Sequence, residues 1–209
     1  MTQPDPSSTL IKIMERIAYK AIEETIGRND LQQAMDMGRL NSVVDHKPEQ
    51  DTEPSIQLTE FSDLQASLEK LYGLRGSQGL VLRSGRACFK YGLREFGTQL
   101  GLDATSFRLL PLNAKISIAT HQFADFLNGS HPRRVNVEEN SSSFLFRIDD
   151  CPICRGRHSD VPVCHLAVGV LEEALYWISG GKHFHVEETN CIAKGDQECT
   201  LVIQKQPLE

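Results

Sequence analysis

Cysteines are concentrated in the carboxyl-terminal part of this chain and restrict how it can fold. Five of its six cysteines follow the spacing C-x2-C-x9-C-x26-C-x7-C, namely Cys151, Cys154, Cys164, Cys191 and Cys199. Residues 1–9 are polar and proline-bearing and do not resemble a secretory signal, so we expect a cytoplasmic protein whose thiols stay reduced. Clustered thiols in a reducing compartment are more typical of metal ligands than of disulfide bridges. The sequence therefore predicts a metal site on which several distant segments converge.

The overall composition excludes two classes of protein. Hydrophobic residues make up 40% and charged residues 24% of the chain, as in ordinary globular proteins. No segment reaches the roughly 18 uninterrupted apolar residues of a membrane span. The net charge is -6, and lysine and arginine are scattered among acidic residues rather than gathered in a basic stripe. We therefore expect neither a membrane span nor a nucleic-acid partner.

The residue pattern divides the chain into three parts. Residues 1–40 form a predicted helical arm, because apolar residues recur at three- and four-residue steps between positions 8 and 27, and a short helix follows at 30–37. Residues 41–57 are polar and proline-bearing, which predicts a linker. Residues 58–205 form the main domain. The apolar stripe of the arm needs a partner, which is its own domain, a second copy or another protein.

The main domain changes from helical to extended periodicity along its length. Helices are expected at 61–72, 79–97 and 113–128, with a turn at 74–79. Gly85 and Gly92 fall on one side of the second helix, which indicates close approach of another backbone or of a ligand. Beyond residue 132 we expect a hairpin at 135–148, a helix at 163–179 and strands at 183–188 and 199–203. This order predicts an α+β fold, with a helical amino-terminal half packed on an antiparallel sheet of about four strands with one inserted helix.

The predicted elements place each cysteine of the cluster near the end of a strand or helix. Four sulfurs within about 4 Å of one another would satisfy tetrahedral zinc, which is the preferred metal. An iron–sulfur cluster is the alternative, although such clusters usually show tighter runs of three cysteines. Four further side chains lie close enough in sequence to replace a thiolate: His158, His165, Glu187 and Glu188.

Four segments of this region resemble the 4-vinyl reductase domain family, at 161–166, 169–172, 186–191 and 193–199. The last two carry the most specific pattern, a carboxylate and a cysteine followed by Gly-Asp and a second cysteine. The resemblance extends over residues 58–205. It implies an α+β ligand-binding module similar in fold to subunits of vesicle-tethering complexes, with an enclosed apolar pocket and frequent homodimerisation.

In the sensory members of this family the resemblance also implies a zinc held by three cysteines and one acidic residue. Transferred to this chain, that set falls on Cys164, Glu188, Cys191 and Cys199, with Glu187 as the alternative carboxylate because only one of two neighbouring strand residues can face the metal. The chain departs from those members by adding Cys151 and Cys154. Whether a thiolate replaces the carboxylate is left open.

A candidate ligand pocket is drawn mainly from aromatic residues. Its members are Arg86, Phe89, Phe123, Phe126, Phe144, Phe146 and Trp177. The simpler interpretation is that the phenylalanines are core residues and that Arg86 belongs to a solvated helix face. Cys88 is interpreted as a core residue, because a free cysteine packs as a small hydrophobe.

Three functions are compatible with these observations. The leading hypothesis is a cytosolic protein that binds a hydrophobic molecule, such as a tetrapyrrole or an aromatic, with a structural zinc site and a connection to chlorophyll metabolism or photosystem assembly. The second is a vinyl reductase-type enzyme of chlorophyll biosynthesis, which is disfavoured because no nicotinamide or flavin motif is present. The third is an assembly or scaffolding protein that binds a partner through its amino-terminal helix. No catalytic residue is assigned, and a binding protein is favoured over an enzyme.

Overall fold

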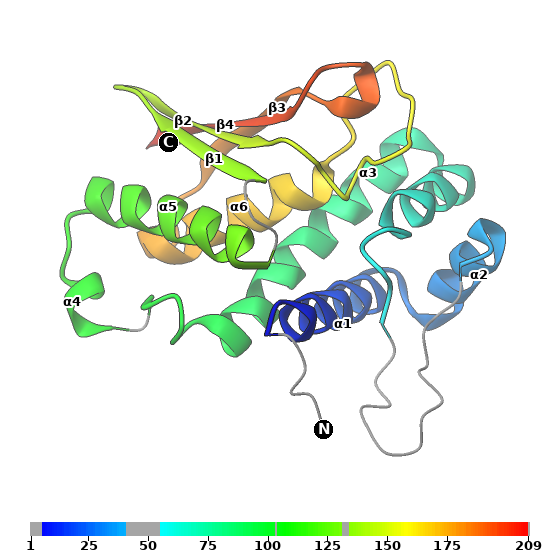
Figure 1. Cartoon of the computed structure of the whole chain (residues 1–209), viewed down its shortest axis with the longest axis horizontal. Helices are drawn as coiled ribbons and strands as arrows, with labels where there is room; N and C mark the ends of the chain where they lie inside the picture. Colours follow the sequence, from blue (N-terminus) through cyan, green and yellow to red (C-terminus); the bar gives the residue numbers. More distant parts are fainter. Residues whose placement is uncertain (1–5, 41–54, 103, 131–133, 209) are drawn as a thin grey trace.

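Helices form the amino-terminal part of the molecule, and a single sheet lies above them (Figure 1). The computed structural model describes residues 6–40, 55–102, 104–130 and 134–208. The helices are α1 (Pro6–Ile26), α2 (Arg28–Gly38), α3 (Phe61–Phe96), α4 (Thr105–Arg108), α5 (Leu112–Ser130) and α6 (His165–Ser179), with a 3-10 turn η1 (Ile192–Lys194). The strands are β1 (Val135–Glu139), β2 (Ser143–Ile148), β3 (Phe184–Asn190) and β4 (Cys199–Pro207).

The sheet has four antiparallel strands in the order β1-β2-β4-β3. Phe144 and Phe146 alternate with more exposed residues along β2, so the sheet buries one face. Helices α5 and α6 lie along that face (Figure 1). The strand count, the antiparallel pairing and the inserted helix α6 confirm the predicted α+β fold.

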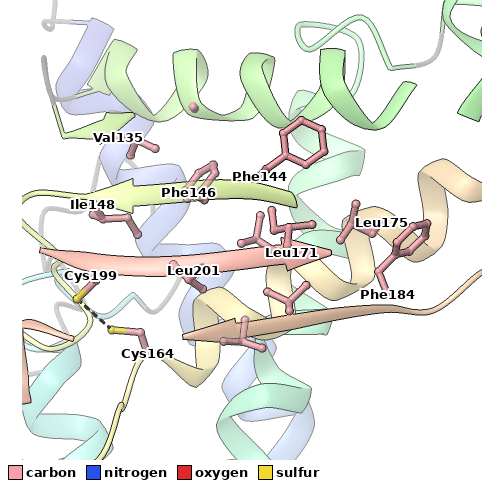
Figure 2. Packing of buried hydrophobic residues seen from close by; sticks show 14 of the residues in the cluster. Val135, Phe144, Phe146, Ile148, Cys164, Leu171, Leu175, Phe184, Cys199 and Leu201 are labelled. Carbon is pink, nitrogen blue, oxygen red and sulfur yellow. Dashed lines mark hydrogen bonds between the residues drawn. The ribbon is translucent and has the colours of Figure 1, made fainter. Parts of the chain in front are cut away.

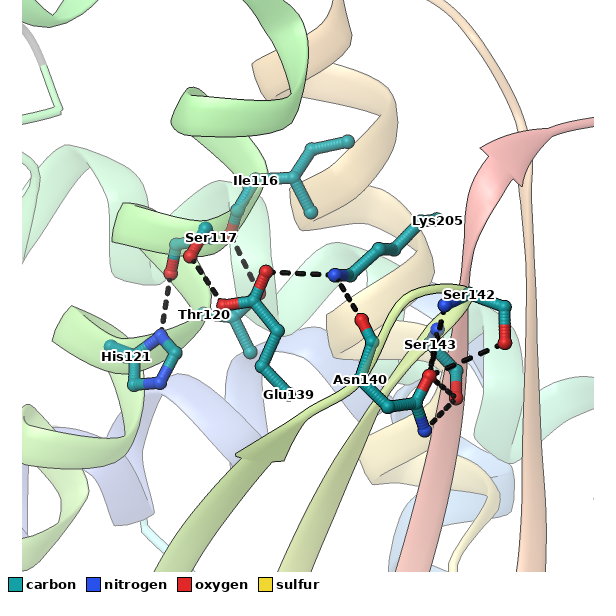
Figure 3. Close-up of polar contacts among 9 residues, drawn as sticks. All are labelled: Ile116, Ser117, Thr120, His121, Glu139, Asn140, Ser142, Ser143 and Lys205. Carbon is teal, nitrogen blue, oxygen red and sulfur yellow. Dashed lines mark hydrogen bonds and ion pairs between the residues drawn. The ribbon is translucent and has the colours of Figure 1, made fainter.

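The β1–β2 turn is fixed by side chains from three elements (Figure 3). Asn140 Oδ1 accepts hydrogen bonds from the backbone N–H groups of Ser142 at 2.9 Å and Ser143 at 2.8 Å, as expected of an asparagine turn. Next to the turn, Glu139 accepts hydrogen bonds from Ser117 on α5 and from Lys205 on β4, each at 2.8 Å. The hairpin is thereby attached to the helix beneath it and to the strand beside it.

Helix α3 contains the main departure from the sequence-based expectation. The turn predicted over 74–79 is wrong, because those residues are helical and the kink is confined to Gly73, which has φ 72° and ψ 165°. Only glycine adopts such a conformation at little cost. One residue therefore changes the helix direction where the glycine-rich sequence indicated a loop.

The buried residues form two apolar cores. One lies between the sheet and helices α5 and α6, and Figure 2 shows its packing around Phe146, Leu171 and Leu201. The other lies between α1, α2 and α3 and includes Ile22, which is 2% exposed. Ile153 packs against both cores. Helix α1 thus covers its apolar face with α3 of the same chain.

Most of the segment expected to be a linker, residues 41–54, lies outside the described residues. Just after it, Ile56 is fully buried in the α1–α3 core. Within the described ranges, no helix combines the length and apolar character needed to cross a membrane.

Candidate metal centre and ligand cavity

All five clustered cysteines meet at one end of the sheet. Cys151 and Cys154 lie in the loop after β2, Cys164 is the amino-terminal cap of α6, and Cys191 and Cys199 flank the turn between β3 and β4. Each is at most 1% exposed, and none forms a disulfide. Figure 2 shows how the helix cap and the start of β4 bring the sulfurs of Cys164 and Cys199 side by side.

Four of the thiols have the spacing of a tetrahedral metal site. Cys151 Sγ lies 3.5 Å from Cys164 Sγ, Cys154 Sγ lies 3.3 Å from Cys199 Sγ, and Cys164 Sγ lies 3.7 Å from Cys199 Sγ. Zinc–sulfur bonds of about 2.3 Å in tetrahedral geometry place the sulfurs about 3.8 Å apart. These four residues, which we call the thiol tetrad, therefore fit a zinc ion with little rearrangement.

A second donor set overlaps the tetrad. Glu188 and Cys191 join Cys164 and Cys199, with all donor atoms within 4.8 Å of one another. Glu188 is 7% exposed, its Oε2 accepts a hydrogen bond of 2.7 Å from the backbone N–H of Cys164, and its Oε1 is buried without a hydrogen-bond partner. The side chain of Glu187 is 63% exposed and pairs with His185. Of the two candidate carboxylates, strand alternation therefore directs Glu188 toward the thiols.

The crowding of the thiols opposes their simultaneous ionisation. Hydrogen bonds to the other cysteines, first of all to Cys151, lower the pKa of Cys154 and raise the pKa of Cys164 and Cys199. The pKa of Cys191 is lowered as well, so the contacts within the cluster favour some thiolates and oppose others. A bound cation would remove this conflict, because metal ligation releases the thiol protons and offsets the negative charges.

Several contacts outside the donor sets hold the cysteine loop. Arg157, whose side chain is 9% exposed, forms an ion pair of 2.6 Å with Glu69 on α3. Gln65 of the same helix donates a hydrogen bond of 3.3 Å to the carbonyl of Val163. These residues were missed in the sequence analysis, because partners 88 and 98 positions apart leave no local pattern.

Shorter-range contacts fix the two cysteines of the β3–β4 turn. Asp196 accepts a hydrogen bond of 2.8 Å from the backbone N–H of Cys191. The backbone N–H of Ile192 lies 3.3 Å from Cys199 Sγ, in position to stabilise a thiolate. Among the described residues neither His158 nor His165 belongs to a donor set. Burial lowers the pKa of His165, which favours its neutral form.

A second feature of the structure is an apolar cavity of about 180 Å³ among the helices and β4. Its walls come from α1, α3, α5, α6 and β4, and the segment after α3 closes one side. The described residues that line it are Met14, Ile17, Ala18, Leu58, Cys88, Phe89, Gly92, Leu93, Phe96, Leu100, Leu102, Ala119, Thr120, Gln122, Phe123, Phe126, Leu127, Leu166, Val170, Leu171, Ala174, Leu175, Ile178 and Ile203.

The candidate pocket residues have different positions relative to this cavity. Its wall contains Phe89, Phe123 and Phe126, whereas Phe144 and Phe146 are buried in the sheet core. Trp177 is 39% exposed, with its ring centroid 6.4 Å from that of Phe89. Arg86 forms an ion pair of 2.8 Å with Glu172 and does not line the cavity.

The wall also contains the thiol of Cys88 and the amide of Gln122. Burial raises the pKa of the Cys88 thiol to about 12, so the thiol stays protonated at neutral pH. Gln122 was missed in the sequence analysis, although its position three residues after Ala119 and four before Phe126 placed it on the apolar stripe of its helix. An amide within such a stripe is the signal that would have identified it.

The cysteine-bearing segment of the chain matches a known domain family. The model of the 4-vinyl reductase domain matches residues 144–205, which run from β2 to β4 and include every cysteine of the cluster. Residues 144–205 are a 4-vinyl reductase domain. The resemblance stated from the sequence is thereby confirmed for residues 144–205. No curated protein matches the chain.

Solved structures extend the similarity beyond the 4-vinyl reductase domain to nearly the whole chain. The Fe(II) unliganded H-NOX protein from K. algicida is 11% identical with a TM-score of 0.59, over 95% of this chain and 96% of that chain. The Fe(II)NO H-NOX protein from S. oneidensis is 14% identical with a TM-score of 0.55, over 93% and 99%. The phenol-responsive sensory domain of the transcription activator PoxR, solved with phenol, is 18% identical with a TM-score of 0.51, over 86% and 90%. At these identities the similarity establishes the fold.

Proposed function

We propose that this protein binds a small apolar molecule in the cavity and that a structural zinc ion holds the end of the sheet where the cysteines meet. The observation that carries the proposal is the cavity itself, which lies among α1, α3, α5, α6 and β4 and is lined almost entirely by apolar side chains. Apolar pockets with a few polar groups are the usual form of small-molecule sites. The same fold in PoxR was solved with phenol, which supports an aromatic occupant.

The size of the cavity favours a molecule of one or two rings over a tetrapyrrole. A cavity of about 150 Å³ is known to hold benzene, and the cavity here measures about 180 Å³. One H-NOX structure of this fold was solved to study haem distortion. Among the described wall residues, however, there is no histidine or tyrosine to bind haem iron, Cys88 retains its proton, and Met14 is a thioether that serves as an axial ligand only opposite a histidine. These residues do not fit a haem, so the proposal does not extend to tetrapyrroles or to chlorophyll metabolism.

The chemistry of the wall supports binding rather than catalysis. The described residues around the cavity include no carboxylate, histidine, lysine or arginine, and the one thiol is protonated at neutral pH. A reductase needs a hydride or electron donor and a source of protons. A receptor needs only shape and apolar surface.

The chemistry of the cluster supports zinc. Four buried sulfurs at tetrahedral spacing match a closed structural site, with no position left for a reactive water. Cys151, Cys154, Cys164 and Cys199 would hold the ion, and Glu188 and Cys191 provide the alternative pair of donors. Reduced thiols of this kind persist in the cytoplasm, which is the location we propose.

The proposal is tested with purified full-length protein and two known probes, phenol and toluene. We expect saturable binding of at least one probe by isothermal titration calorimetry, and about one zinc per chain by elemental analysis. Light scattering on the same sample tests the homodimer implied by the family resemblance. A folded, zinc-containing protein that binds neither probe would contradict the proposed receptor function.

A further inference from the structure

The two donor sets of the metal centre overlap in a way that a single ion does not explain. They share Cys164 and Cys199, and each set has two further donors of its own. The unshared donors are Cys151 and Cys154 in the thiol tetrad, and Glu188 and Cys191 in the other set. One tetrahedral ion takes four donors and leaves two buried ones without a metal. Two tetrahedral ions that share two bridging thiolates take six donors, which is the number that the two sets contain.

The sheet separates the strands that carry the two unshared pairs. Strand β4, which begins at Cys199, lies between β2 and β3 in the strand order β1-β2-β4-β3 (Figure 1). Cys151 and Cys154 follow β2, whereas Glu188 lies on β3 and Cys191 comes directly after it. The chain therefore provides one pair of donors on each side of the shared thiol of β4.

Glu188 gives evidence for a cation on the β3 side that does not depend on the spacing of the thiol tetrad. Its side chain is 7% exposed, and its Oε1 atom is buried without a hydrogen-bond partner. No ion pair among the described residues includes Glu188. A buried carboxylate needs a compensating charge. A zinc ion in the tetrad alone does not supply it, because its four thiolates outnumber its two positive charges.

We infer that the centre binds two zinc ions, with Cys164 and Cys199 as bridging thiolates. The thiol tetrad holds the first ion, and Glu188 and Cys191 complete the site of the second. The second ion brings two positive charges and its two unshared ligands bring two negative ones, so the buried site gains no net charge. The second ion binds more weakly, since it shares two thiolates with the first. The inference rests on the proposed zinc site and is independent of the cavity.

Native mass spectrometry of the full-length protein counts the ions on each chain. We expect about one zinc in the protein as purified, and a second after incubation with excess zinc and removal of free metal. Glu188→Gln should weaken binding of the second ion more than about 100-fold, measured by calorimetry, and leave the first in place. Glu187→Gln is the matched control, because this neighbouring carboxylate is 63% exposed and belongs to neither donor set. It should bind two ions as the wild type does.

Cadmium NMR tests the bridging thiolates directly. Cadmium, like zinc, binds thiolates and replaces zinc in such sites, since soft metals prefer sulfur ligands. For the wild type we expect two resonances of equal intensity that are coupled to each other, because the shared sulfur atoms transmit the coupling. Cys191→Ser should show one resonance only, and it provides a second variant if Glu188→Gln fails to fold.

The outcomes separate this inference from the zinc site on which it rests. A single ion at saturating zinc would overturn the second site and leave the first intact. A second ion that persists in both Glu188→Gln and Cys191→Ser, or that shows no coupling to the first, would lie elsewhere on the protein and would also overturn it. A folded protein that binds no zinc at all would remove both proposals.

Discussion

Gly85 shows how closely two helices of this fold approach each other. A Cβ atom at Gly85 on α3 would lie 2.2 Å from the carbonyl oxygen of Leu166, and one at Gly169 on α6 would lie 2.1 Å from the carbonyl oxygen of Leu82. Both contacts are with backbone atoms, which cannot rotate away. The two glycines therefore permit the α3–α6 crossing, and both helices contribute to the cavity wall.

Gly85→Ala should consequently destabilise the protein by about 3 kcal/mol, because the added methyl group forces the two helices apart. Chemical denaturation monitored by circular dichroism measures this change. Gly92→Ala is the matched control, since it adds the same group one heptad later on α3, where no atom lies within 4 Å of the new Cβ.

Because alanine favours the helix, the control should stabilise the protein by about 1 kcal/mol. It should also weaken toluene binding, since Gly92 lines the cavity. Equal effects of the two substitutions on stability would contradict the close crossing.

The two donor sets make different predictions about zinc binding. Cys164 and Cys199 belong to both sets, so substituting either to serine should abolish tight zinc binding. Cys151→Ser should lower zinc affinity more than about 100-fold if the thiol tetrad holds the ion, whereas Cys191→Ser should lower it far less. Competition with a chromophoric chelator measures these affinities.

Cys88→Ala is the control for the removal of a cysteine, because Cys88 lies in the cavity wall and outside both donor sets. Its zinc affinity should equal that of the wild type. The reverse pattern, with zinc lost in Cys191→Ser and Glu188→Gln but kept in Cys151→Ser, would assign the ion to the set that includes the carboxylate.

The sequence predicts the element types well where the signal is local. The asparagine at position 140 marks the hairpin turn, and the change of period near residue 132 marks the start of the sheet. The same local signals were misleading at Gly73, where a single left-handed residue bends α3 and the glycine-rich sequence after it remains helical. A glycine is compatible with a turn, a kink or a close crossing, and only the packing around it decides among them.

The cysteine site could be predicted from the sequence better than its supporting contacts or the cavity. Short spacing and a reducing compartment predict that the cysteines converge, because each lies at the end of an element. The ion pair of Arg157 with Glu69, which holds the cysteine loop, was not predictable. It joins residues 88 positions apart and so depends on the complete fold. The position of the cavity was also beyond the sequence, because core and pocket phenylalanines have the same periodicity.

The metal centre and the cavity share two structural elements. Helix α6 begins next to Cys164 and contributes Leu171 to the cavity wall, and β4 begins at Cys199 and contributes Ile203. A metal that fixes the first residues of α6 and β4 would also fix the spacing between the two sides of the cavity that these elements form. Zinc binding and ligand binding should therefore be coupled.

Removal of zinc with a chelator should lower the Tm by roughly 10 °C or more, because a structural metal contributes several kcal/mol to folding. The chelated protein, kept below its Tm, should also bind the preferred probe several-fold more weakly. Calorimetry with and without chelator measures both effects, and restoring zinc should reverse them. A chelated protein that keeps its full probe affinity would show that the two sites act independently.

Coupling of this kind must be reciprocal, which provides a second and independent measurement. If zinc tightens probe binding by a given factor, saturating probe must tighten zinc binding by the same factor. The chelator competition is therefore repeated with phenol present, and the two factors are compared. Unequal factors for the wild-type protein would mean that the chelator changes more than zinc occupancy, and the shared-element explanation of the coupling would then fail.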